Sequence, residues 1–96
     1  MGTTKEKMSE YLEKAQTLQR IAQGTADVSI DTSVVSSGST CVNVHVYPLD
    51  EKAQFLKDKK GNIMYHKFCF AEWETPQANG KMFKKMMQIQ KEMFDL

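Results

Sequence analysis

Two cysteines and two histidines are the residues of this 96-residue chain best suited to chemistry. Cys41, His45, His66 and Cys69 are side-chain types that bind zinc. Alternate residues of a strand point to opposite faces, so Cys41 and His45 share a face whereas His66 and Cys69 do not. Their spacing also matches no zinc ribbon or finger. We therefore predict no metal site and no cofactor.

A catalytic thiol needs a base within hydrogen-bond reach, and Cys69 with His45, on separate strands, is the one pair that meets this description. A disulfide between Cys41 and Cys69 is an alternative across neighbouring strands. The chain has no phosphate-binding glycine loop, no dinucleotide fingerprint and no H-E-x-x-H motif. Asp27 and Asp31 share a strand face with serines, which is typical of a solvated edge strand protected by charge. We predict no catalytic residues and no enzyme activity.

The elements that position these residues begin with a helix. Thr3 followed by Glu6 forms a capping-box pattern, and apolar residues then recur at helical spacing as far as Ala22. Gly24 stands where a left-handed C-terminal cap belongs.

Strand periodicity follows, with Val28 and Ile30 alternating with polar residues and 36–40 forming a turn. Cys41 to Tyr47 alternates cleanly between Val42, Val44 and Val46 on one face and Cys41, Asn43, His45 and Tyr47 on the other. We expect a further strand over about 53–57, with a short helical turn as the alternative, and a hairpin tip at 57–62. We then expect a long strand from Ile63 to Trp73, with Phe68 and Phe70 in the core. No internal repeat appears.

We expect the last helix to begin at Pro76, with Thr75 as its cap. A start near Lys81 is the alternative, because Gly80 is unfavourable inside a helix. The apolar stripe of this helix is wider than one small core needs, and methionine adapts readily to a partner surface. The fold class is therefore α+β, a single domain over residues 1–96. We expect two layers, an antiparallel meander of three to four strands with the N- and C-terminal helices packed on one face. The candidate interface residues are Met86, Met87, Met93 and Phe94 on this helix, and Tyr65 and Trp73 on the long strand.

Positive charge is concentrated late in the chain. Residues 1–50 carry four basic and six acidic side chains, and residues 51–96 carry nine basic and six acidic. Three of the lysines open the last helix, where the helix dipole also attracts anions.

The order helix–meander–helix, with lysines opening the second helix, is similar to the topology of double-stranded-RNA-binding domains. Such domains bridge the grooves of a duplex with that helix start, the first helix and a strand loop. Here Met and Phe replace the small residues of the family's second helix, and the 36–40 turn has no histidine or basic residue. The resemblance implies nucleic-acid contacts at Lys59, Lys60, Lys81, Lys84 and Lys85.

Neither a secretory signal nor an apolar run long enough to span a bilayer appears, so we expect a cytoplasmic protein with reduced thiols and no membrane partner. The leading hypothesis is a non-catalytic protein-interaction domain that binds itself as a homodimer or binds another protein. The alternative is a nucleic-acid-binding module.

Overall fold

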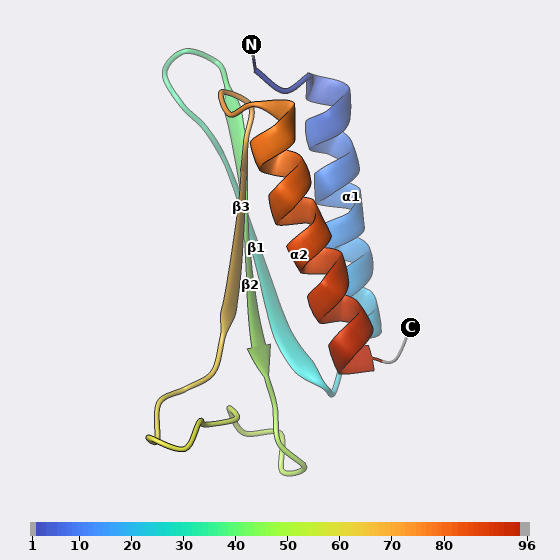
Figure 1. The fold of residues 1–96 in the computed structure, drawn as a ribbon, viewed down its shortest axis with the longest axis vertical. Coiled ribbons are helices and arrows are strands. Elements are labelled where there is room, and N and C mark those ends of the chain that lie inside the picture. The colour runs from blue at the N-terminus through green and yellow to red at the C-terminus, as the bar shows by residue number, and fades with distance from the viewer. Residues whose placement is uncertain (1, 95–96) are drawn as a thin grey trace.

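The computed structural model describes residues 2–94 and has the element order α1 (Lys5–Ile21), β1 (Ala26–Val34), β2 (Thr40–Pro48), β3 (His66–Ala71) and α2 (Pro76–Phe94). The three strands form one antiparallel sheet in the order β1-β2-β3. Both helices lie on the same face of this sheet (Figure 1). The predicted two-layer α+β architecture is therefore confirmed, with three strands. Neither helix of residues 2–94 combines the length and the apolar character needed to cross a bilayer.

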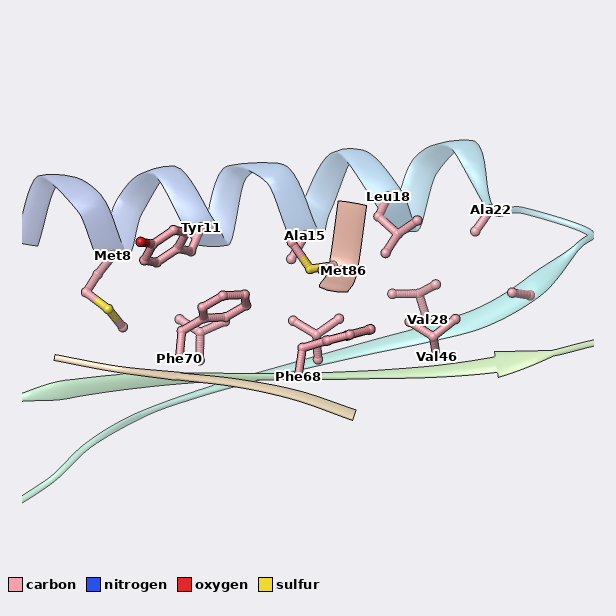
Figure 2. Close-up of a cluster of buried hydrophobic side chains, with 13 residues drawn as sticks. Met8, Tyr11, Ala15, Leu18, Ala22, Val28, Val46, Phe68, Phe70 and Met86 are labelled. Carbon is pink, nitrogen blue, oxygen red and sulfur yellow. The ribbon is translucent and has the colours of Figure 1, made fainter. Parts of the chain in front are cut away.

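The core forms where α1 and α2 meet the sheet. Met8, Tyr11, Ala15 and Leu18 point from α1 towards the strands, as their helical spacing requires (Figure 2). The ring of Tyr11 stacks on that of Phe70, with 4.6 Å between centroids. Phe68 and Phe70 are both buried, as predicted, and Phe70 is fully enclosed. Burying a side chain of this size contributes about 2–3 kcal/mol to folding.

The start of α1 lies one residue later than the capping-box pattern predicts. The side chain of Thr4, not that of Thr3, accepts a hydrogen bond from the backbone N–H of Lys7 at 3.2 Å. Thr3 is buried, and its backbone N–H donates to the carbonyl of Glu72. The shift has a physical cause, because Thr3 is recruited to the chain that follows β3. The predicted start of α2 is confirmed, since the hydroxyl of Thr75 accepts from the N–H of Ala78.

Two strand predictions are wrong. The long strand predicted from Ile63 to Trp73 is reduced to β3, because Trp73 lies in the turn before α2 and 63–65 precede the sheet. Residues 53–57 form no strand and make only isolated pairings, Leu49 with Phe55 and Lys57 with Ile63. We call the segment 49–65 the arm. In Figure 1 it is the yellow-green segment that extends beyond the end of the sheet, away from both helices.

Candidate protein-interaction surface

The arm consists of two successive turns with the same hydrogen-bond pattern. In the first, Oδ1 of Asp50 accepts from the backbone N–H groups of Lys52 and Gln54, at 2.8 and 3.0 Å. The N–H of Asp50 donates to the carbonyl of Gln54 at 2.8 Å. Such Asx turns supply hydrogen bonds that a short loop otherwise lacks.

The second turn repeats this geometry eight residues later. Oδ1 of Asp58 accepts from the N–H groups of Lys60 and Asn62, again at 2.8 and 3.0 Å. Each turn has one residue in the left-handed region, Ala53 with φ +60° and Gly61 with φ +85°. The two Asx turns therefore fold the arm back on itself twice, and the N–H of Met64 reaches the carbonyl of Leu56.

The repeated turn geometry has a counterpart in the amino-acid sequence. Residues 49–56 read L-D-E-K-A-Q-F-L and residues 57–64 read K-D-K-K-G-N-I-M. Each half has an aspartate in the second position, a lysine in the fourth, an amide in the sixth and two apolar residues at its end. The expectation of no internal repeat is therefore wrong at this short period, and the repeat was the signal that could have identified the arm.

An aromatic cluster joins the arm to the sheet. The rings of Tyr47 and Tyr65 stack with centroids 5.5 Å apart, and Tyr47 meets Phe55 at 5.4 Å. Tyr47 lies on the sheet face that the helices leave uncovered, as predicted from the alternation of β2. Tyr65 nevertheless remains 55% exposed. The ring contacts of Tyr47 with Phe55 and Tyr65 thus hold the arm against the sheet, and part of the aromatic surface of the arm remains exposed.

The arm also carries several exposed apolar side chains. Those more than a third exposed are Phe55, Leu56, Ile63, Met64 and Tyr65. Contiguous exposed apolar surface on a small protein is typical of an interaction site. The structure therefore shows four further exposed apolar side chains in the same segment as Tyr65.

The open sheet face itself is more polar than we expected. Register places Asp31 opposite Asn43, which lies opposite Cys69, and His45 opposite Lys67. His45 and Cys69 are therefore diagonal neighbours, a relationship that separates Cα atoms by about 7–8 Å. The predicted apolar, aromatic patch is confined to the end where Tyr47 and Tyr65 meet.

Both cysteines are free thiols, and Cys41 is buried with its sulfur 2.9 Å from Oγ of Ser33. Register places Cys41 opposite Ala71, so Cys41 and Cys69 are not opposed across the sheet. Within residues 2–94, no three His, Cys, Asp or Glu side chains lie close enough together to hold a metal ion.

The apolar stripe of α2 packs mainly on its own domain. Met86 is fully buried in the core and is not available to a partner. Met87, Met93 and Phe94 are half-buried and pack against the same core. Trp73 is 52% exposed at the opposite end of β3 from Tyr65. The structure therefore does not bring the six predicted interface residues together.

The predicted nucleic-acid contacts fall into two separate groups. Lys81, Lys84 and Lys85 are exposed on the first half of α2, which has no acidic residue in its first turn. Lys59 and Lys60 are exposed in the second turn of the arm. The arm as a whole extends beyond the other end of the sheet (Figure 1).

A shallow groove of about 420 Å³ lies between β3 and α2, and Tyr65 of the arm also lines it. Lys85 of α2 lies along it together with Tyr65 and Lys67. Glu92 and His66 also line it, so its charge is mixed.

Comparison with known proteins gives no family for this small α+β domain. No protein-family model matches the chain, and no curated protein or solved structure matches it.

Proposed function

We propose that this domain is a non-catalytic protein-interaction module that associates with itself. The location of its uncovered apolar surface supports this function. Within residues 2–94, nine large apolar side chains are at least about a third exposed, and seven of them lie in just two segments. Five belong to the arm, and Val34 and Val35 lie at the end of β1, with Ile21 and Trp73 the two outside. Apolar surface gathered in this way gains free energy when a partner covers it.

Light scattering across a range of concentrations tests self-association directly. We expect a mass of twice the 11.0 kDa of the chain at high concentration. Val34→Lys and Ile63→Lys each place a charge in one of the two apolar segments, and at least one of them should lower the mass. Ile21→Lys is the matched control, because Ile21 is an isolated exposed apolar side chain. A mass of one chain at every concentration would contradict the proposal.

A cytoplasmic location is part of the same proposal. Its support is that Cys41 and Cys69 are both free, because thiols stay reduced in the cytoplasm. Thiol titration of the protein under native and unfolding conditions, after extraction with a blocking reagent, should find two reactive groups. A disulfide in freshly extracted protein would argue against this location.

Nucleic-acid binding is a second candidate function. It is supported by the exposed lysines Lys81, Lys84 and Lys85 and by an element order similar to that of double-stranded-RNA-binding domains. However, the hydroxyl-rich β1–β2 turn is uncharged, and Lys5 and Lys7 of α1 are paired with Glu72 and Glu10.

Titration with duplex RNA at low and high salt tests this candidate. Binding through phosphates should weaken steeply as salt rises, because counterions are released. Replacing Lys81, Lys84 and Lys85 together by alanine should weaken it further, with Lys59→Ala/Lys60→Ala as a test of the arm. No detectable binding of duplex RNA or single-stranded DNA at low salt would remove this function.

A further inference from the structure

The hydrogen bonds at the ends of β1 show which of its residues direct their backbone groups towards β2 and which direct them outward. The N–H of Leu49 donates to the carbonyl of Thr25, and the N–H of Val35 donates to the carbonyl of Ser39, both at 2.9 Å. Thr25 and Val35, which flank β1, therefore direct their backbone groups towards the neighbouring chain. Hydrogen-bonded positions alternate along an antiparallel pair, so the odd-numbered residues of β1 bond to β2 and the even-numbered residues do not. The backbone groups of Ile30, Thr32 and Val34 therefore point away from the sheet.

The first half of this edge is already occupied. The side-chain amide of Gln19, on α1, donates to the carbonyl of Val28 at 2.8 Å. This contact covers the edge where the end of α1 lies over β1. It also sets a boundary, because only the backbone from Ile30 onwards is left for another strand.

The second half of the edge is open and apolar. A groove of about 400 Å³ separates the first half of α1 from the end of β1, with Met8 and Leu12 on the helix side. Val34 lines this groove and is 69% exposed. Edge strands are usually protected by charged side chains, especially lysine, by proline or by a bulge. In this half of β1 the one charged residue is Asp31, whose side chain lies on the open sheet face, and the residues whose backbone groups point outward are Ile30, Thr32 and Val34.

The other edge of the sheet is protected, both by a covering side chain and by a lysine. At β3 the side chain of Asn79 satisfies the backbone of Ala71, and Lys67 lies further along the strand. The N–H of Glu72 donates to the carbonyl of Thr40, so by the same alternation Lys67 points its backbone outward. This contrast between the two edges indicates that the edge of β1, and not that of β3, is available to pair with another strand.

We infer that the β1 edge pairs antiparallel with the β1 edge of a second copy, around a two-fold axis at Thr32. This inference rests on the proposed self-association and names its surface. The axis places Ile30 opposite Val34 of the second copy and leaves Val28 outside the paired segment. An axis at Ile30 would instead place Val28 opposite Thr32 of the second copy. The carbonyl of Val28 already accepts a hydrogen bond from the side chain of Gln19.

Charge is compatible with this register, as it is with an axis at Ile30, which places Asp31 opposite Ser29 of the second copy. Asp31 lies on the open sheet face together with Ser33 and Asp27. An axis at Thr32 places Asp31 opposite Ser33 of the second copy, so that no two aspartates face each other, and Asp27 lies beyond the overlap. Like charges directly opposed across strands are destabilising. A second copy therefore fits this edge: the outward backbone groups of the two strands can bond to each other, apolar side chains meet, and no like charges are directly opposed.

Site-specific disulfide trapping tests the register. Asp31 and Ser33 of the second copy form a non-hydrogen-bonded pair, with Cα atoms about 4.5 Å apart and within disulfide reach. Asp31→Cys and Ser33→Cys are made separately, in a background with Cys41→Ser and Cys69→Ser, because Cys41 contacts Ser33. Mild oxidation of the mixture should give a cross-linked dimer, and each variant alone should not.

The controls separate this inference from the function on which it rests. A mixture of Asp31→Cys with Ser29→Cys in the same background tests the axis at Ile30 and should remain uncross-linked. If the 31–33 mixture gives no cross-link although light scattering shows a dimer, the inference is overturned and self-association stands. A monomer at every concentration overturns both.

Edge prolines provide a second, independent test. Thr32→Pro removes an outward N–H without breaking the pairing of β1 with β2, since proline is tolerated on edge strands. It should halve the mass while circular dichroism shows a folded protein. Lys67→Pro makes the same change at the β3 edge and should leave the mass unchanged. A folded Thr32→Pro variant that is still a dimer overturns the inference.

Discussion

The side chain of Asn79 makes to Ala71 the two hydrogen bonds that a fourth strand would make at the outer edge of β3. The N–H of Ala71 donates to Oδ1 of Asn79 at 3.2 Å, and Nδ2 of Asn79 donates to the carbonyl of Ala71 at 2.9 Å. Nδ2 also donates to the hydroxyl of Thr3 at 2.6 Å. Thr3 in turn donates from its N–H to Glu72 and from its hydroxyl to Glu74. One buried amide thus joins the N-terminal segment, the end of β3 and the start of α2.

Replacing Asn79 by alanine should therefore destabilise the whole domain. The change leaves the N–H and carbonyl of Ala71 without these partners, and unsatisfied buried groups cost about 1–3 kcal/mol each. We expect a loss of about 3 kcal/mol in the free energy of unfolding, measured by urea denaturation. Gln77→Ala, at an exposed position of the same helix, should change it by less than about 0.5 kcal/mol. Equal effects of the two variants would show that the network does not stabilise the fold.

The two turns of the arm provide a matched pair of substitutions. Ala53 has φ +60°, a conformation that costs an L-residue about 1–2 kcal/mol, whereas Gly61 occupies the equivalent position at φ +85°. Ala53→Gly should stabilise its turn by about 1 kcal/mol, and Gly61→Ala should destabilise its turn by a similar amount. A Cβ at Gly61 would meet no atom within 4 Å, so the effect is one of backbone conformation alone.

Hydrogen exchange measures each turn separately. The amides of Asp50 and Asp58 donate across the two turns, so their protection reports on local opening. Protection at Asp50 should rise in Ala53→Gly, and protection at Asp58 should fall in Gly61→Ala. Changes of the opposite sign would mean that left-handed strain does not limit the arm.

Hydrophobic periodicity predicts the elements of this fold because burial has the same period as the structure. Phe68 and Phe70 lie two residues apart on one face of a strand, and Met8, Tyr11 and Ala15 lie along one side of a helix. These patterns are local, so they survive without knowledge of the tertiary structure. The three strands, both helices and the core face of β2 could be predicted for this reason.

The candidate site could not be predicted in the same way. Apolar residues at 63–65 continue the alternation of β3 in sequence, yet they belong to the arm and stay exposed. Periodicity does not distinguish side chains that the domain covers from those that it leaves exposed. In α2, likewise, the stripe does not show that Met86 is enclosed and Met87 only half-buried. Both distinctions depend on strand register and helix packing, which are non-local.

Glu72 should make the domain's stability depend on acid pH. Its Oε2 accepts from the N–H of Thr40 at 2.8 Å, and Lys5 is bonded to the same carboxylate. These contacts, the Thr40 N–H first, hold the pKa of Glu72 below its ordinary value. A lowered pKa in the folded state stabilises the protein above the ordinary glutamate pKa of about 4.3, and this stabilisation is lost as pH falls through the lower folded value.

Glu72→Gln should therefore reduce the loss of stability on acidification. The comparison is the free energy of unfolding of variant and wild type by urea denaturation at pH values above about 5 and below about 4. The difference between the two proteins should shrink at the lower pH. Glu13→Gln, at an exposed position of α1, is the control and should keep the acid dependence of the wild type. An unchanged acid dependence in Glu72→Gln would contradict the role of these hydrogen bonds.

Met86 and Met87 distinguish a core role from an interface role within one helix. Met86 is fully buried, so Met86→Ala should lower the free energy of unfolding by about 2–5 kcal/mol. Met87 is half-buried at the margin of the same core, so Met87→Lys should cost less, about 1–2 kcal/mol. If the second copy binds at β1, Met87→Lys should leave the mass in light scattering unchanged, because α2 packs on its own sheet. A folded Met87→Lys variant of half the mass would instead place the contact between copies on α2, where the apolar stripe first suggested it.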